Sequence, residues 1–221
     1  MCIRDRFTTA NGNYSTAMGQ ETSAEGIRST AIGYQTTAGG DTSTAMGDFT
    51  SATGDRSTAM GINTTASGRF STAMGNQTEA SGIYSTAMGF GTKANGGSST
   101  AMGQGTTANG FVSTALGEFT EASGSFSTAM GQGTSAQDYG TIAIGIFNKI
   151  KETSNPNQYS LQNTAFVIGN GLSDNRSNAF EVLFDGTTTI NGNTNLNGWT
   201  YFNEVSEFNS CLLYTSPSPR D

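Results

Sequence analysis

The sequence predicts an all-β protein, a parallel β-roll or solenoid whose coils each take 14 residues. The first supporting observation is the motif Ser-Thr-Ala-Met-Gly at 15–19, which returns every 14 residues and, with a degenerate last copy at 141–145, occurs ten times. The second is the motif Thr-x-Ala-x-Gly at 22–26, which keeps the same period to residue 124. The third is that no insertion or deletion interrupts the array. Such a period is typical of chains that stack one structural unit per repeat.

Each period divides into a strand of five residues, a corner of two, a second strand of five and a second corner of two. Side chains alternate between the two faces of a strand, so Ser15 and Ala17 share the face opposite Met18. A helix is excluded, because helical spacing would scatter the alanines and glycine weakens a helix interior. We expect the glycines to close the strands where a positive φ or a close backbone approach is needed.

The inward faces carry only small residues and predict a flattened tube that is too narrow for larger side chains. Stacked coils would lie about 4.8 Å apart, each strand pairing in parallel with its equivalent one coil on. We expect the inner hydroxyls to hydrogen-bond up and down the stack, because buried polar groups need partners. The predicted interior includes Ser15, Ala17, Thr22, Ala24, Ser43, Ala45, Thr50 and Ala52.

A column of large apolar residues lies on the outer face of the first strand, beside a column of threonines. Seven of the chain's eight methionines are in it. A monomer would expose this column, so we expect identical columns to meet around a common axis. Complete burial would contribute on the order of 15–30 kcal/mol per chain as an upper estimate. The expected interface residues are Thr16, Met18, Ile32, Met46, Met60, Met74, Met88, Met102, Leu116, Met130 and Ile144.

The alternative interpretation of this column is that methionine fills the interior of its own tube. The alternation of methionine with the small residues argues against it, because the two sets then point to opposite faces. We therefore keep self-association as the main prediction.

Composition limits the function. The 221 residues carry a formal charge of −7 and no histidine, and Leu, Ile, Val and Phe make up about 16% of them. That share is typical of disordered chains, but a disordered segment would not keep a fixed period. The acidic balance disfavours nucleic acid as a partner, and no apolar run approaches the roughly 18 residues of a membrane span.

Both ends differ from the rest of the chain. Residues 1–6 and 211–221 resemble translated sequencing-adapter read-through, and the period already runs through 8–12, directly after the first of them. We expect both to be artefacts and the remainder to be an internal fragment of a longer protein. Cys2 and Cys211 lie in these ends, so the cysteine count gives no redox compartment.

The repeat Ser-Thr-Ala-Met-Gly-x-x-Thr-x-Ala-x-Gly resembles the head repeat of trimeric autotransporter adhesins, the YadA-like head. The family motif reads roughly Asn-Ser-Val-Ala-Ile-Gly-x-x-Ser-x-Ala-x-Gly, and Thr16 stands where the family prefers valine. The resemblance covers Thr8 to Gly145, within an expected head domain at 7–148. It implies a left-handed β-roll, a homotrimer, exposure at the bacterial cell surface or outer membrane, and attachment of the kind that serves virulence. The matching residues are Ser15, Ala17, Met18, Gly19, Thr22, Ala24 and Gly26.

Residues 149–210 follow the array and are expected to form a small β-rich cap or neck. Strands are predicted at 165–169 and 178–184, the second turned by Asp185-Gly186 into a third at 187–190. This segment is similar to those that follow such heads in bacterial surface proteins and in phage tail fibres. No heptads occur in it, so no coiled coil is expected.

No constellation for catalysis is present in the sequence, because each serine of the array is one of many copies and histidine is absent. We expect no enzymatic activity, no cofactor and no metal, and we expect the aspartates of the corners to be solvated. The corners are variable, and their aromatic residues are open to two interpretations: a multivalent surface for a glycan or matrix protein, or packing against a neighbouring subunit or coil. The candidate ligand surface contains Tyr34, Phe49, Phe70, Tyr84, Phe90 and Phe119.

Three functions stay open at this point. A surface adhesin head leads, with the chain itself and an unknown surface ligand as partners. A phage tail-fibre shaft or receptor-binding segment, located on a virion tail, is the second. An ice-binding solenoid is the third, because threonine columns suit a flat lattice.

Overall fold

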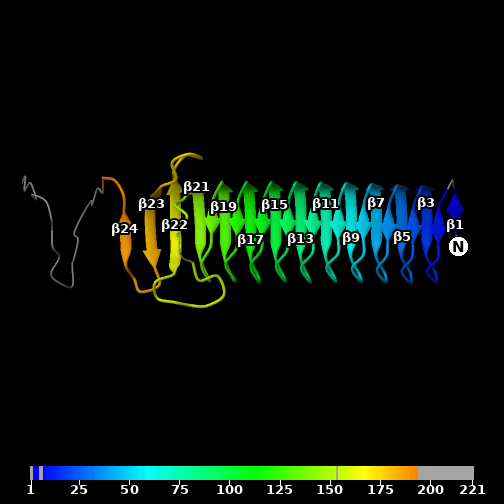
Figure 1. Cartoon of the computed structure of the whole chain (residues 1–221), viewed down its shortest axis with the longest axis horizontal. Coiled ribbons are helices and arrows are strands. Elements are labelled where there is room, and N and C mark those ends of the chain that lie inside the picture. The colour runs from blue at the N-terminus through cyan, green and yellow to red at the C-terminus, as the bar shows by residue number, and fades with distance from the viewer. Residues whose placement is uncertain (1, 5–6, 153, 194–221) are drawn as a thin grey trace, which may run out of the picture. The chain divides into compact units, whose positions relative to one another are not determined.

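The computed structural model describes residues 2–4, 7–152 and 154–193, and it confirms the predicted fold class. These residues form an all-β parallel solenoid with one coil per 14 residues (Figure 1). The chain divides into two units, Met1–Asn191 and Gly192–Asp221, and the first contains all of the strands that the structure describes. The predicted artefact at 211–221 and the part of the predicted neck at 194–210 lie outside the described residues.

The first sheet consists of long strands that pair in parallel, each in register with its equivalent one coil on. Thr16, Ala17 and Met18 pair with Thr30, Ala31 and Ile32, and this register continues along the array. The strands lie one residue later than predicted. They are β1 (Cys2–Arg4), β3 (Thr16–Gln20), β5 (Thr30–Tyr34), β7 (Thr44–Asp48), β9 (Thr58–Ile62), β11 (Thr72–Asn76), β13 (Thr86–Phe90), β15 (Thr100–Gln104), β17 (Thr114–Glu118), β19 (Thr128–Gln132) and β21 (Ile142–Ile146).

The second sheet consists of two-residue strands, so the prediction of five-residue strands here was wrong. After Ala24 the N–H groups of Glu25 and Gly26 both donate to the carbonyl of Ala38, at 2.9 and 3.2 Å. Two successive donors on one acceptor end the ladder, because a strand sends successive N–H groups in opposite directions. The strands are β2 (Thr9–Ala10), β4 (Ser23–Ala24), β6 (Thr37–Ala38), β8 (Ser51–Ala52), β10 (Thr65–Ala66), β12 (Glu79–Ala80), β14 (Lys93–Ala94), β16 (Thr107–Ala108), β18 (Glu121–Ala122) and β20 (Ser135–Ala136).

The core between the two sheets is built from small side chains. From Ala17 to Ala143 the alanines of both motifs are fully buried. The serine or threonine two residues before each alanine is buried as well. The glycines keep neighbouring coils close: a Cβ on Gly40 would lie 2.1 Å from the carbonyl oxygen of Gly54. The coil spacing therefore leaves no room for a side chain at this position.

Within the described residues the inner hydroxyls form no continuous ladder of the predicted kind along the stack, although Thr8 and Thr141 each donate to a carbonyl of the following coil. Identical hydroxyls in successive coils are one strand spacing apart, about 4.8 Å, which exceeds the length of a hydrogen bond. Ser71 and Ser113 instead donate within their own coil, to the carbonyls of Gly68 and Gly110, at 2.6 and 2.7 Å. Hydrogen bonding by these serines is therefore local to one coil.

Each corner places its second residue in the left-handed region, a feature that the sequence does not reveal. The φ angle is +62° at Tyr14, +55° at Glu21 and +59° at Arg28, and it stays positive at every seventh residue up to Phe147. L-residues reach this region at a cost, and for a β-branched residue it is a genuine outlier. Val112, with a φ of +53°, therefore carries more backbone strain than most corner residues.

Three further strands extend the first sheet beyond the array, close to where the sequence predicts them. β22 (Thr164–Asn170) continues the parallel register of β21, while β23 (Asn178–Leu183) and β24 (Thr188–Ile190) add in antiparallel order. The Asp185-Gly186 turn joins β23 to β24, and Thr187 donates its backbone N–H to Asp185 at 2.7 Å, which lowers the pKa of that carboxyl.

Neighbouring glycines give a direct test of the coil spacing. We expect Gly40→Ala to destabilise the chain by about 3 kcal/mol or more, because the new Cβ meets a backbone carbonyl that cannot move alone. Gly39→Ala, whose Cβ would meet nothing closer than 3.6 Å, should change stability by less than about 1 kcal/mol. Denaturant unfolding of both variants measures the difference, and equal stabilities would contradict the proposed packing.

The corner conformation predicts a stabilising substitution. We expect Val112→Gly to raise the free energy of unfolding by roughly 1 kcal/mol, because glycine adopts a positive φ without strain. Thr107→Gly, in a strand of the second sheet, should instead lower it by about 0.5–1 kcal/mol. Thermal unfolding of the two variants compares them, and a loss of stability in Val112→Gly would show that its side-chain packing outweighs the strain.

Candidate functional site

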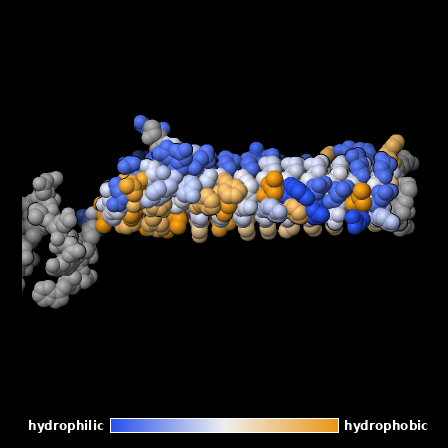
Figure 2. Space-filling model, turned by 90° about the horizontal axis from the view of Figure 1, so that it is seen from below, coloured by the Kyte–Doolittle hydropathy of each residue, from blue (hydrophilic) through white to orange (hydrophobic). Residues whose placement is uncertain are grey.

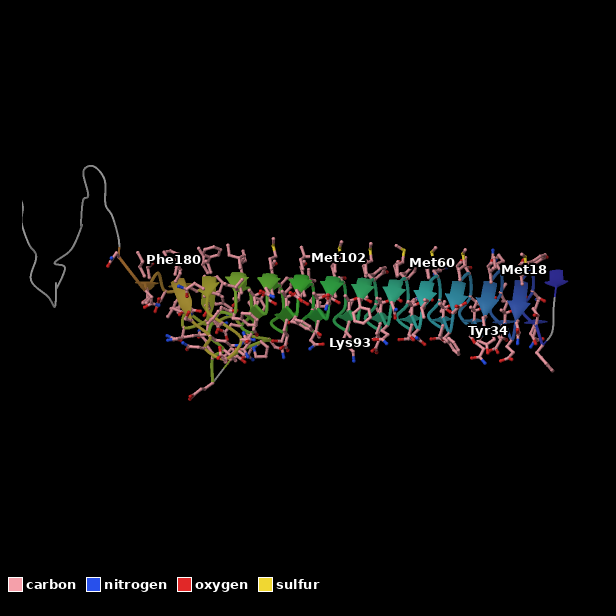
Figure 3. All side chains as sticks on the ribbon, turned by 90° about the horizontal axis from the view of Figure 1, so that it is seen from above. Met18, Tyr34, Met60, Lys93, Met102 and Phe180 are labelled. Carbon is pink, nitrogen blue, oxygen red and sulfur yellow. The ribbon has the colours of Figure 1, made fainter. Side chains whose placement is uncertain are left out.

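The predicted interface residues form one continuous column on the outer face of the first sheet. Strand register stacks Met74 on Met88 and Met88 on Met102, with the threonine column beside them. The labelled side chains of Met18, Met60 and Met102 point to the same side, away from that of Lys93 (Figure 3). In the single chain these side chains are half covered by their neighbours, with 37–41% of Met18, Met60, Met102 and Met130 exposed.

This column, which we call the apolar stripe, continues into the strands beyond the array. Register places Ile168 beside Ile144, Phe180 beside Ile168, and Ile190 beside Phe180. The threonine column becomes apolar over the same strands, as Ile142, Phe166 and Val182. The Phe180 side chain points to the same side as the labelled methionines (Figure 3). This extension was not predicted, although the Ile-Gly ending at 168–169 repeats that of the array.

The candidate ligand residues lie on two opposite edges of the solenoid. We define the first edge by the last residue of each long strand and the residue after it, such as 20–21, and the second edge by the corner that precedes the next long strand, such as 27–28. The first edge carries Tyr34, Phe49, Phe90 and Phe119, whereas the second edge carries Phe70 and Tyr84. They therefore do not form a single surface.

Rings of the first edge pack within their own chain. The rings of Tyr34 and Phe49, from successive coils, meet edge to face at 5.2 Å. Phe119 lies over Gly105, where an added Cβ would fall 2.6 Å from the ring. These contacts favour the interpretation in which aromatic corner residues cover the adjacent coil.

The second edge combines aromatic and basic residues. The rings of Phe70 and Tyr84 stack in parallel with centroids 4.9 Å apart, and the guanidinium groups of Arg56 and Arg69 each lie 5.1 Å from the centre of the Phe70 ring. Arg69 and Phe70 belong to one corner, and Arg56 and Tyr84 belong to the corners of the coils before and after it. The four side chains therefore lie on three successive coils.

Two corner aspartates of the second edge have a structural role that the sequence did not indicate. Asp41 accepts the N–H of Ile27 at 2.9 Å, and Asp55 accepts the N–H of Asp41 at 3.2 Å. Each carboxylate therefore caps a donor of the preceding coil, although both residues are exposed to solvent as expected.

Asp138 closes the array at the position where earlier coils have glycine. It is buried, and it accepts hydrogen bonds from Lys151 Nζ at 3.0 Å, from the N–H of Asn155 at 2.8 Å and from the N–H of Thr164 at 3.1 Å. A side chain fits here because no further coil places its carbonyl over this slot.

Asn148 closes the exposed edge of the second sheet at the same junction. Its side-chain amide accepts the N–H of Ser135 at 2.7 Å and donates to the carbonyl of Ser135 at 2.9 Å, in place of a following strand. A sheet edge satisfied in this way offers no template for another strand. The polar junction is thus explained by chain closure.

Two features are absent from the described part of the chain. Within residues 2–4, 7–152 and 154–193, no three His, Cys, Asp or Glu side chains gather closely enough to bind a metal ion. In the same ranges, no helix has the length and apolar character needed to cross a bilayer.

The junction predicts the effect of restoring the repeat residue. We expect Asp138→Gly to destabilise the chain by about 3 kcal/mol, because the buried N–H of Thr164 and two further donors lose their acceptor. Lys151→Met should cost less, about 1 kcal/mol, since the lysine is partly exposed. Denaturant unfolding measures both, and a wild-type midpoint for Asp138→Gly would rule out this closing role.

Comparison with known families assigns the array. The family described as YadA head domain repeat (2 copies) matches residues 7–22, 24–50, 52–78, 80–106, 94–117, 108–134 and 122–147, which together cover more than half of the chain. No curated protein matches the chain. The resemblance found in the repeat motif is confirmed, and the chain belongs to the family built from YadA head domain repeats.

Proposed function

We propose that this chain is the head of a homotrimeric, non-enzymatic adhesin that attaches a bacterial surface to a host or environmental surface. The observation that carries the proposal is the apolar stripe, which runs the length of the array and on through Ile168, Phe180 and Ile190. The family supports the kind of assembly, because YadA-like heads are trimeric and lie at the cell surface. The predicted artefact at 1–6 and the domain limits remain expectations.

The stripe supports self-association energetically. About two fifths of each of the exposed methionines remains uncovered in the single chain. The other six large apolar members of the column are less exposed, so the upper estimate for the column falls below roughly 6–12 kcal/mol per chain. That is comparable with the whole stability of a typical domain, so covering the stripe would decide whether the solenoid persists.

Attachment follows from rigidity and repetition. A straight array holds its corners at fixed intervals, so weak contacts to a repetitive surface add along the stack. A phage tail fibre would use the same physical features. Antibody labelling of the protein on intact cells and on purified virions distinguishes the two locations. Ice binding is less well supported, because a methionine, isoleucine or leucine stands beside each threonine of the column and makes that face uneven.

A matched pair of double variants tests the assembly. Met60→Asp with Met102→Asp places two charges on the stripe, and Thr65→Asp with Thr107→Asp places two charges in the same coils on the outer face of the second sheet. If the stripe is buried between chains, the methionine pair should lower the free energy of unfolding by several kcal/mol more than the threonine pair. Equal losses by thermal unfolding would contradict the proposed interface.

The same variants test attachment. Beads coated with the wild-type chain should adhere to a panel of cells and abiotic surfaces, and beads that carry the methionine pair should adhere several-fold less, because the assembled head is lost. The threonine pair should adhere like the wild type. Absence of adhesion by the wild type to every surface would contradict the adhesin function.

A further inference from the structure

The second edge holds a surface that the array's structural role does not explain. We define the basic-aromatic patch as Arg56, Arg69, Phe70 and Tyr84, together with the hollow that extends from Tyr84 to Phe111. Figure 2 looks onto this edge, where a hydrophilic cluster is followed toward the C-terminal side by apolar side chains. The patch departs from its surroundings, since the chain as a whole is acidic with a net charge of −7.

The hollow arises from a gap in the corner residues. Neighbouring corners carry Ile83-Tyr84 and Phe111-Val112, but the corner between them is Gly97-Ser98. The absence of a large side chain at this corner leaves a depression of about 450 Å³, with Tyr84 on one side, the Phe111 ring against Gly97 on the other, and the polar side chain of Asn95 in its lining. A volume of this size, apolar with a few polar groups, suits a small ligand or one or two rings of a longer one.

The two arginines are available to an anion. Within the described residues, neither Arg56 nor Arg69 has a carboxylate within salt-bridge distance, and the ion pairs found there involve Lys93 and Lys151 instead. The nearby Asp41 and Asp55 already accept backbone N–H groups. A planar guanidinium held against an aromatic ring presents its free edge to a carboxylate or sulfate in a bidentate manner.

The spacing of coils relates the two parts of the patch. Arg69 and Gly97 are two coils apart, which is about 10 Å along the stack. An extended chain of sugar rings spans that distance, with one ring in the hollow and an acidic group at the arginines. Because one face of the Tyr84 ring stacks on Phe70, its other face is the one that offers a stacking surface of this kind.

A peptide partner is disfavoured by the sheets. Strand addition needs unpaired N–H and C=O groups, and the strands around the patch pair on both sides within their sheets. Recognition on this edge therefore depends on side chains, and the available side chains are rings, guanidinium groups and an amide. This combination fits the apolar faces, hydroxyls and acidic groups of a charged sugar.

We propose that the basic-aromatic patch binds an acidic oligosaccharide, with a sugar ring between Tyr84 and Phe111 and its carboxylate or sulfate at Arg56 and Arg69. The proposal rests on the proposed function, because it names the ligand class of the adhesin head. Rings on both edges contact their own chain, and the ligand site uses what the second edge adds to this packing: the two arginines and the hollow between Tyr84 and Phe111.

Titration calorimetry of the full chain tests the ligand class with matched probes. Oligogalacturonate and its methyl ester share one sugar backbone and differ in whether the carboxyl groups are ionised, and a dextran sulfate oligomer and dextran provide the corresponding comparison for sulfate. We expect at least one acidic probe to bind and both neutral counterparts to bind at least ten-fold more weakly. The acidic probe that binds identifies the group, while binding of neither acidic probe would overturn the proposal.

Variants test the location. Arg56→Gln with Arg69→Gln should weaken binding about ten-fold or more, because charge-assisted hydrogen bonds are lost. Ser98→Tyr should also weaken it, because it fills the hollow with a residue that Tyr84 already shows to be compatible with the same corner and a positive φ. Lys93→Gln removes one charge from the outer face of the second sheet and should leave binding unchanged.

Unchanged affinity in both the arginine pair and Ser98→Tyr would place the ligand elsewhere and overturn the site. If Lys93→Gln weakened binding as much as the arginine pair does, the affinity would depend on net charge alone, and the proposed site would also be contradicted. If coated beads still adhere to cells while no acidic probe binds, this inference fails and the adhesin function stands. If neither adhesion nor probe binding occurs, both fail.

Discussion

The close approach of successive coils is the constraint on which the rest of this structure depends. At Gly40 a single methyl group would lie 2.1 Å from a carbonyl oxygen of the next coil, and equivalent glycines along the array are as tightly placed. The interior that results admits alanine, serine and threonine only. The same spacing explains why the array ends at Asp138, since a side chain fits this slot only where no further coil follows.

The thin interior determines where the large side chains of the chain lie. Because no methionine or phenylalanine fits between the sheets, the large side chains lie on the outer face of the first sheet or at the corners. On the outer face they form the apolar stripe, which the chain alone leaves partly uncovered. At the corners they either fold onto a neighbouring coil, as Phe119 does over Gly105, or stand beside a gap, as Tyr84 does. Assembly and recognition therefore use surfaces that the coil itself cannot bury.

Most of the architecture follows from residue types and their spacing. The period predicted the solenoid, and the alternation of Ala17 with Met18 predicted the inner and outer faces. The short second strand was not predictable, because it depends on Glu25 and Gly26 both donating to Ala38, a feature of backbone geometry without a residue signature. The left-handed corners were also hidden, since residues as different as Tyr14 and Val112 adopt them.

The candidate site was only partly accessible from the sequence. The stripe was predicted within the array, but its extension through Phe180 depends on antiparallel pairing that places distant residues side by side. The separation of the aromatic corners into two edges required the coil geometry. The arginine pair around Phe70 involves residues 56 and 69, which are 13 apart, so a search for repeats 14 apart does not find it.

The central claim is that a core of small residues leaves the apolar stripe on the outside, where other copies of the chain cover it. Sedimentation equilibrium of the full chain over a range of concentrations tests this claim. A trimer of chains of 22.9 kDa would have a mass of about 69 kDa. The account predicts this mass, with a folded β signal that is lost when the complex dissociates. A folded species that stays at 22.9 kDa at every concentration would contradict it.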